Sequence, residues 1–207
     1  MLDWLSNPWL AEHWLEIFGF VTGGLCVLLA ARRNIWTFPL GLASNVVYIV
    51  VFFEVALYAD MGLQFVYIVL GVTGWIGWNR ARADDNRAAT VHLPPRVIPF
   101  LLIALVVGTV ILTFVLITFT DSSTAVPDAG TTTMSLVAQF MLNRRWIENW
   151  FVWIAVDVAY IALYAYKELY ITSALYLLFI GFCVYGYLTW RKAPHAIASP
   201  QPSLSNA

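Results

Sequence analysis

The stretch that decides the fold is RRWIENWFVWIAVDVAYIALYAYKELY, residues 144–170, because residues 32–58 repeat its outline as RRNIWTFPLGLASNVVYIVVFFEVALY. Residue 144 aligns with residue 32 at an offset of 112, and the gapless match extends over residues 32–80 and 144–192. Identical residues stand at Arg32/Arg144, Arg33/Arg145, Ile35/Ile147, Val46/Val158, Tyr48/Tyr160, Ile49/Ile161, Leu57/Leu169, Tyr58/Tyr170, Gly74/Gly186 and Trp78/Trp190, and Asn45 stands opposite Asp157. The chain therefore contains an internal sequence repeat.

The composition indicates a membrane protein. Hydrophobic residues make up 61% of the chain and charged residues 11%, whereas soluble domains average about 45–50% and about 25%. Apolar runs long enough to cross about 30 Å of hydrocarbon as helices lie at approximately 14–31, 35–53, 61–79, 97–119, 130–143, 147–166 and 170–190. We therefore predict an all-α integral membrane protein with seven transmembrane helices.

The basic residues predict the orientation. Under the seven-helix count, one side of the membrane receives Arg32, Arg33, Arg80, Arg82, Arg87, Arg96, Arg144, Arg145, Arg191 and Lys192. The other side receives only Lys167. Because loops rich in Lys and Arg stay in the cytoplasm, we expect the N-terminus outside and the C-terminus in the cytoplasm. Nothing resembles the basic patch that nucleic-acid binding needs; the lipid bilayer is the expected surrounding.

The repeat predicts the architecture. The second and third helices pair with the sixth and seventh, and this even separation means that both copies run in the same direction. The fourth helix is then a connector, which gives the three-plus-one-plus-three, parallel-repeat arrangement of the SWEET sugar transporters. We expect a first three-helix repeat with its cytoplasmic loop at 1–96, a connector helix at 97–120, a second three-helix repeat at 121–192 and a disordered tail at 193–207. This topology makes a transporter the leading hypothesis.

The sixth predicted helix presents a polar aromatic stripe. Trp150, Trp153 and Asp157 fall on one face of it, because residues three and four apart are neighbours on a helix. A carboxylate at mid-membrane costs about 2.5–3.5 kcal/mol on insertion scales, so it should face the protein interior. The two tryptophans either stack on a ligand or simply pack. Asn45 and Gln64, near mid-membrane in the second and third helices, either bind a ligand or join helices by hydrogen bonds.

The positions of the titratable residues argue against an enzyme. The three histidines fall outside the predicted spans, Asp157 has no second deep carboxylate, and no metal-ligand spacing occurs. A retinal-type receptor would need a lysine inside its last helix, yet Lys167 precedes that helix and Lys192 follows it. A structural protein would not concentrate polar groups on one inner face. Trp78, Trp146 and Trp190 lie near helix ends and are interpreted as anchors at the membrane interface.

Two segments resemble the PnuC-type bacterial vitamin transporters. WIENWFVWIAVDV, residues 146–158, is similar to the family's sixth-helix pattern of two tryptophans three apart followed four residues later by Asn or Asp. LYADMGLQFVYIVLGVTGWIGW, residues 57–78, resembles its third helix. The resemblance implies a facilitator without a cofactor in the bacterial inner membrane, which admits a pyridine-nucleotide precursor, best known as nicotinamide riboside, that a cytoplasmic kinase then traps. It implies substrate binding by Trp150, Trp153 and Asp157, with Asn45, Gln64 and Gln139 as weaker candidates.

One position departs from the nicotinamide riboside pattern. Members that carry this substrate often have Asn where this chain has Asp157, whereas relatives that resemble riboflavin or thiamine transporters can carry Asp. A carboxylate suits the positive charge of nicotinamide riboside or thiamine, and it could equally accept hydrogen bonds from riboflavin. The sequence therefore leaves riboflavin and thiamine as alternative substrates, and it leaves the oligomeric state and ion coupling open.

Overall fold

A computed structural model describes residues 8–54, 58–83, 90–120, 124–166 and 170–192. These residues form α1 (Pro8–Ala31), α2 (Thr37–Glu54), α3 (Tyr58–Ala83), a short 3-10 turn (Pro95–Val97), α4 (Ile98–Phe119), α5 (Ala125–Asn143), α6 (Asn149–Tyr166) and α7 (Tyr170–Arg191). The prediction of an all-helical chain is confirmed for this part, and the helix bounds lie close to the predicted spans. Lys167 and the tail at 193–207 lie outside the described residues.

Local sequence explains where the helices form and begin. Apolar segments in lipid must satisfy every backbone group internally, which favours helices. The turn before α2 is held by Asn34, whose Oδ1 accepts a hydrogen bond from the backbone N–H of Trp36 at 3.0 Å, and α4 has a proline in its first turn, where its missing N–H is harmless. By length and hydropathy, three segments of the described chain are sufficient to cross a membrane: Met61–Ala81, Pro95–Phe119 and Asn149–Tyr166.

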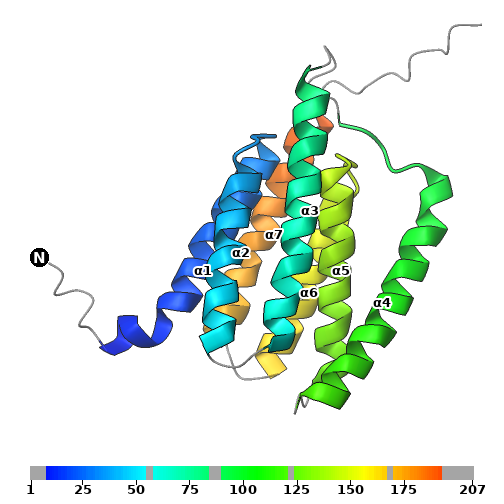
Figure 1. Cartoon of the computed structure of the whole chain (residues 1–207). Helices are drawn as coiled ribbons and strands as arrows, with labels where there is room; N and C mark the ends of the chain where they lie inside the picture. Colours follow the sequence, from blue (N-terminus) through cyan, green and yellow to red (C-terminus); the bar gives the residue numbers. More distant parts are fainter. Residues whose placement is uncertain (1–7, 55–57, 84–89, 121–123, 167–169, 193–207) are drawn as a thin grey trace, which may run out of the picture.

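Six of the described helices form a closed ring. Helix α2 packs between α1 and α3, α6 packs between α5 and α7, and the contacts of α3 with α5 and of α1 with α7 close the ring. Helix α4 packs on α5 from outside and stands apart from the ring (Figure 1). None of its residues is buried. The core therefore lies inside the ring, and α4 adds no side chain to it.

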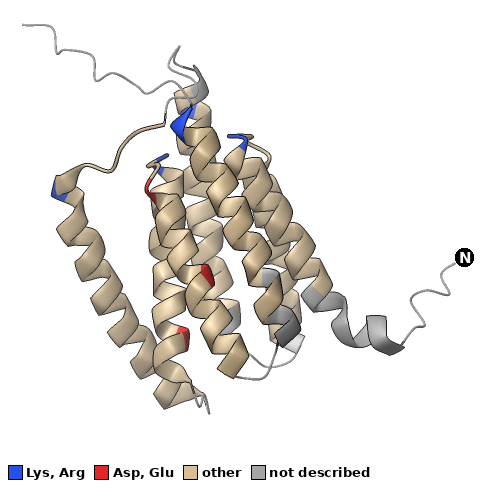
Figure 2. Cartoon of the chain, turned by 180° about the vertical axis from the view of Figure 1, so that it is seen from behind, with Lys and Arg blue, Asp and Glu red and all other residues tan. Residues whose placement is uncertain are grey.

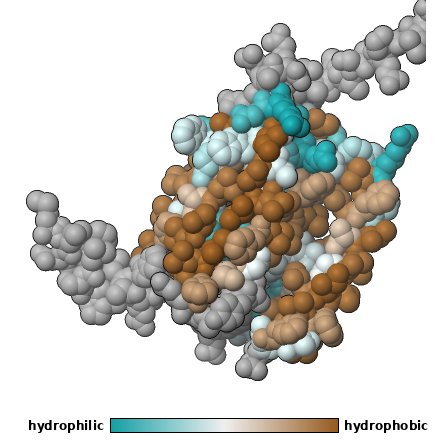
Figure 3. Space-filling model, in the orientation of Figure 1, coloured by the Kyte–Doolittle hydropathy of each residue, from teal (hydrophilic) through white to brown (hydrophobic). Residues whose placement is uncertain are grey.

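The outer surface has the polarity of a membrane protein. Hydrophobic side chains cover the visible lateral face, and hydrophilic ones gather at one end (Figure 3). That end carries the arginines of the described chain (Figure 2). We call it the arginine end; its members are Arg32, Arg33, Arg80, Arg96, Arg144, Arg145 and Arg191. Exposed apolar side chains on the helix flanks face the region where lipid would lie.

The two copies of the repeat adopt the same local structure. Adding the offset of 112 to the bounds of α2, Thr37 and Glu54, gives the bounds of α6, Asn149 and Tyr166. The turn before each helix contains the same left-handed arginine, with φ of 54° at Arg33 and 61° at Arg145. Left-handed backbone is unfavourable for a residue with a Cβ atom. Its presence at both positions shows that the repeat extends to backbone conformation.

The turn before α6 is held by hydrogen bonds from the segment between α3 and α4. The backbone N–H of Val91 donates to the carbonyl of Arg145 at 3.1 Å, and its carbonyl accepts from the N–H of Ile147 at 3.0 Å. The carboxylate of Glu148 accepts from the backbone N–H of Leu93 at 2.8 Å and lies 2.8 Å from the ring of His92. The other turn has Trp36 at the position equivalent to Glu148, and this side chain is 65% exposed.

Candidate functional site

The ring encloses a cavity of about 650 Å³. Side chains of α1, α2, α3, α5, α6 and α7 line it, and no lining residue among the described ones comes from α4. The volume falls within the range of about 300–1,000 Å³ that small-molecule sites occupy. The inside of the ring is therefore the candidate functional site.

All six predicted site residues lie on the wall of this cavity. Asn45 comes from α2, Gln64 from α3, Gln139 from α5, and Trp150, Trp153 and Asp157 from α6. The side-chain amides of Asn45 and Gln64 have no hydrogen-bonding partner within the described part of the chain. The structure thus brings the predicted residues together, and it leaves two polar groups available to a ligand.

Asp157 is a carboxylate without a basic neighbour. Its side chain is 5% exposed, and Oδ2 accepts a hydrogen bond from the thiol of Cys183 at 3.6 Å. No Lys, Arg or His of the described chain forms an ion pair with it, and none lines the cavity. A buried charge without a partner is costly, and a positive charge beside the carboxylate offsets part of that cost. The site can therefore accommodate a cation beside Asp157.

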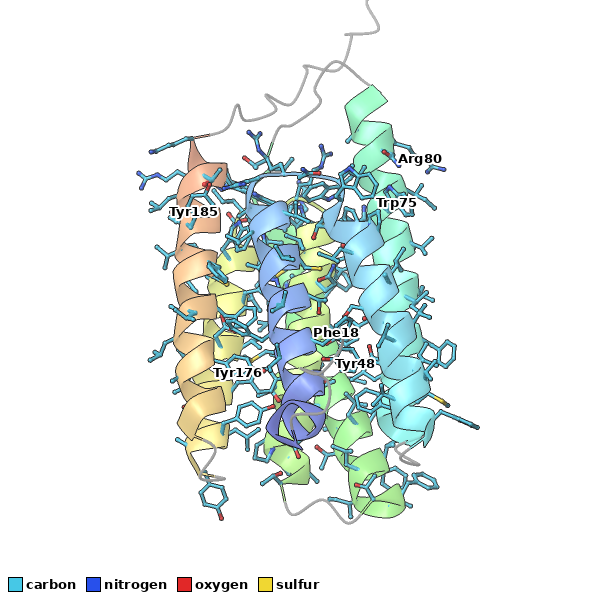
Figure 4. The ribbon with its side chains drawn as sticks, turned by 90° about the vertical axis from the view of Figure 1, so that its left-hand side faces the viewer. Phe18, Tyr48, Trp75, Arg80, Tyr176 and Tyr185 are labelled. Carbon is cyan, nitrogen blue, oxygen red and sulfur yellow. The ribbon has the colours of Figure 1, made fainter. Side chains whose placement is uncertain are left out.

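Aromatic side chains flank the half of the cavity that lies away from the arginine end. Phe18, Tyr48 and Tyr176 lie at this level, below Trp75 and Arg80, and Tyr185 points outward near the arginine end (Figure 4). The stacks follow the repeat: Tyr48 lies 5.6 Å from Phe52, and Tyr160 lies 5.8 Å from Tyr164 between ring centroids. Aromatic faces of this kind can stack on a flat ring, which favours a planar ligand.

Two tryptophans, one from each half, meet between the cavity and the arginine end. The rings of Trp78 and Trp190 lie 6.0 Å apart. Trp78 Nε1 donates to the carbonyl of Leu142 at 3.4 Å, and Trp190 Nε1 donates to the carbonyl of Ala30 at 3.1 Å. Ala30 and Leu142 are themselves 112 residues apart and line the cavity. The two halves thus hold each other by reciprocal hydrogen bonds.

The prediction that Trp78, Trp146 and Trp190 anchor the membrane interface is wrong. All three are buried in the structure. Nearness to a helix end indicates depth along the membrane normal, but it does not indicate whether a side chain points to lipid or to the interior. The repeat pairing of Trp78 with Trp190 was the available signal for an inward position.

Trp150 takes part mainly in packing. Its side chain is 1% exposed, and its ring meets that of Trp190 edge to face at 5.4 Å. A Cβ atom on Gly186 would approach the Trp150 ring to 2.5 Å, so only glycine fits there. The equivalent pair in the other half, Phe38 and Gly74, is equally close. Both tryptophans line the cavity, but Trp153 is only half-buried, so it is the more accessible one of the predicted pair.

The predicted set missed lining residues on α1, α5 and α7, among them Ser135, Tyr176 and Cys183. The stripe on α6 was visible because a carboxylate interrupts an aromatic helix face. Residues on α7 carry no such mark. The signal that could have found Tyr176 is the repeat, because Tyr176 occupies the position of Gln64 in the other copy.

Comparison with known proteins agrees with this geometry. Residues 13–192 match the model of the family described as nicotinamide mononucleotide transporter. The nicotinamide riboside transporter PnuC of Neisseria mucosa is 30% identical over 197 residues, which are 90% of this chain and 74% of the relative. PnuC of Escherichia coli K12 is 25% identical over 202 residues, covering 86% and 84%.

A riboflavin relative and a solved structure complete the comparison. The riboflavin/roseoflavin transporter RibM of Streptomyces davaonensis is 25% identical over 197 residues, covering 91% of this chain and 92% of the relative. A crystal structure of the vitamin B3 transporter PnuC superposes with a TM-score of 0.66 at 28% identity, covering 92% of this chain and 85% of that one. These matches confirm the resemblance to PnuC-type transporters, and the chain belongs to the nicotinamide mononucleotide transporter family.

Proposed function

We propose that this membrane transporter carries nicotinamide riboside. The observation that supports this substrate most directly is Asp157, a buried carboxylate that lines the cavity without a basic partner in the described chain. The pyridinium of nicotinamide riboside would supply the missing positive charge, and it would gain from contact with an indole face such as that of Trp153. The named relatives from Neisseria mucosa and Escherichia coli carry the same substrate.

The cavity favours the riboside over the mononucleotide. The mononucleotide adds a phosphate group, and an anion at membrane depth requires a compensating charge. The described lining residues include no Lys, Arg or His that could supply it. Riboflavin is the second candidate, because RibM matches nearly the full length of the chain. Thiamine shares the cationic character that Asp157 would recognise.

We propose the three-plus-one-plus-three arrangement for the whole chain, with repeats at 1–96 and 121–192 and α4 as the connector. Three observations support it: α2 and α6 share their bounds at the offset of 112, Arg33 and Arg145 share a left-handed turn, and α4 packs outside the ring. Transport would then be a rearrangement of the two repeats around the cavity.

The proposed mechanism is facilitated diffusion. The substrate would cross down its gradient, and a cytoplasmic kinase would trap it by phosphorylation. The Trp78–Trp190 pair would have to separate before the cavity opens toward the arginine end, because its rings and hydrogen bonds join the two halves there. In this mechanism the Asp157 carboxylate pairs with the positive charge of the substrate, and it does not couple transport to an ion.

A binding screen tests the proposed function. Purified protein is titrated with nicotinamide riboside, thiamine, riboflavin, nicotinamide and nicotinamide mononucleotide, and we expect the riboside to bind most tightly. Proteoliposomes should equilibrate the riboside without accumulating it under an imposed proton or sodium gradient. Tighter binding of riboflavin would favour the second candidate, and gradient-driven accumulation would contradict facilitated diffusion.

The gathering of arginines at one end predicts the orientation in the membrane. We expect the C-terminus in the cytoplasm. A reporter that is active only outside the cytoplasm should stay silent when fused after Lys192 and should be active when fused after Lys167. The reverse pattern would contradict both the orientation and the seven-helix count.

Trp153→Ala should weaken riboside binding, because stacking on an aromatic side chain contributes about 1–3 kcal/mol. The expected loss of affinity is roughly 5-fold to 150-fold by isothermal titration. Trp36→Ala is the matched control, since Trp36 is exposed outside the cavity. Equal affinities of the two well-folded variants would assign Trp153 to packing.

A further inference from the structure

The two seams that close the ring differ in chemistry. The α3/α5 seam and the α7/α1 seam are equivalent by the repeat, so each lining residue of one has a counterpart 112 residues away in the other. Six such pairs line the cavity: Gln64 and Tyr176, Tyr67 and Phe179, Gly71 and Cys183, Gly23 and Ser135, Val27 and Gln139, and Ala30 and Leu142. In four of the six pairs, the α3/α5 member carries a hydrogen-bonding side chain: Gln64, Tyr67, Ser135 and Gln139. At the α7/α1 seam only the Tyr176 hydroxyl and the Cys183 thiol do so, and the other four members carry none.

The α3/α5 seam, the polar seam, presents an ordered set of hydrogen-bonding groups. The hydroxyl of Ser135 donates to the carbonyl of Thr131 at 2.9 Å, and the side chain of Tyr67 lines the same seam from α3. Gln139 Nε2 donates to Asn143 Oδ1 at 3.2 Å, which holds the amide in place. The amide of Gln64 has no partner in the described chain. A ligand at this seam would meet fixed donors and acceptors.

The α7/α1 seam, the aromatic seam, is filled by rings. Phe179 meets Phe20 edge to face at 5.5 Å and lies 5.8 Å from Tyr176. A Cβ atom on Gly23 would lie 3.4 Å from the Phe179 ring, so the ring covers the backbone of α1. A hydroxylated group placed here would lose hydrogen bonds to water and would find few partners to replace them, which is unfavourable.

Asp157 determines which end of the ligand lies at which seam. Helix α6 stands between the seams, and the hydrogen bond from Cys183 holds the Asp157 carboxylate on the side of α7. A cationic ring paired with Asp157 therefore lies toward the aromatic seam. The remainder of the molecule extends toward α5 and the polar seam.

We infer that the polar seam determines specificity for the sugar of the substrate, with Tyr67, Ser135 and Gln139 receiving its hydroxyl groups while the cationic ring lies beside Asp157. This inference rests on the proposed function. The seam selects a nucleoside over its free base, because a ligand without the sugar leaves the remaining hydrogen-bonding capacity of these groups unused. Sites built to hydrogen-bond a hydroxyl discriminate strongly against analogues that lack it.

The test compares two cations that differ in the sugar. Nicotinamide riboside and 1-methylnicotinamide both carry the pyridinium, and only the first carries ribose. Tyr67→Phe removes one hydroxyl from the polar seam, and Gln139→Val installs the residue that its own repeat partner, Val27, has at the aromatic seam. We expect each variant to lower riboside affinity roughly 5-fold to 20-fold and to leave 1-methylnicotinamide affinity within about 2-fold.

Tyr176→Phe removes the same hydroxyl from the aromatic seam, so any loss that it causes should be equal for the two ligands. Tyr185→Phe is the matched control that should change neither affinity by more than about 2-fold, because this side chain points outward and does not line the cavity. An equal loss for both ligands in the Tyr67 and Gln139 variants, or selective loss in the Tyr176 variant, would overturn the orientation while the proposed function stands. Wild-type protein that fails to bind the riboside would overturn the proposed function, and the orientation with it. Melting temperatures establish that each variant is folded.

Discussion

Trp190→Ala is expected to lower the free energy of unfolding by about 3–5 kcal/mol, the usual loss when a buried aromatic side chain is truncated. The Trp190 side chain is 0% exposed and packs on Trp78 and Trp150. Its Nε1 also donates to the carbonyl of Ala30 on the first helix of the ring. The variant therefore removes a contact within one half and a contact between the halves at the same time.

Equilibrium unfolding in mixed detergent micelles, followed by circular dichroism, measures this loss. Trp36→Ala serves as the control, because that tryptophan is mostly exposed at the turn before α2. A control within about 0.5 kcal/mol of wild type is expected for a surface substitution. If Trp190→Ala cost no more than the control, the tryptophan pair would not hold the halves together.

Asp157→Asn should reduce the affinity for nicotinamide riboside by roughly 10-fold to 150-fold. The substitution preserves the shape of the side chain and removes the charge that pairs with the pyridinium. Hydrogen bonds that involve a charged group contribute about 1.5–3 kcal/mol, and a carboxylate in a low dielectric separates cations from neutral ligands more strongly than an amide does. Neutral riboflavin should lose much less.

Glu148→Gln is the matched control for charge. Glu148 is also a carboxylate, and it lies in the turn between α5 and α6. It binds Leu93 and His92 at the arginine end and does not line the cavity. Its replacement should leave riboside affinity within about 2-fold while Asp157→Asn reduces it. Unchanged binding in a folded Asp157→Asn protein would show that Asp157 has a structural role and does not bind the substrate. If wild type accumulated substrate under a proton gradient and the variant did not, Asp157 would be a coupling site.

The repeat made most of the fold predictable. The offset of 112 reproduces the bounds of α6 from those of α2 to the residue. The pair α1 and α5 was harder to relate, because α5 carries Ser135 and Gln139 where α1 has Gly23 and Val27. Those differences lie on the cavity wall. Sequence similarity thus failed where the two halves have acquired different chemistry, which is also where the substrate is expected to bind.

The candidate site was predictable in part for a similar reason. Polar groups within apolar helices are conspicuous, and Asn45, Gln64 and Asp157 all proved to line the cavity. Tryptophans are not conspicuous in this way, since a large apolar side chain is compatible with lipid, interior or interface. The direction of Trp150 and Trp190 depends on contacts with Gly186 and Ala30, which are distant in the sequence and became visible only in three dimensions.

The closure of the ring by α7 also sets an order for biosynthesis. The hydrogen bond from Trp190 to Ala30 spans 160 residues, and α1 meets no second-half helix strongly except α7. While the ribosome is still making α7, α1 therefore has only α2 as a lasting neighbour, and the cavity is open to lipid along one side. The substrate chamber comes into existence with the last helix, so a nascent chain that stops before Tyr170 has a bundle but no enclosed pathway.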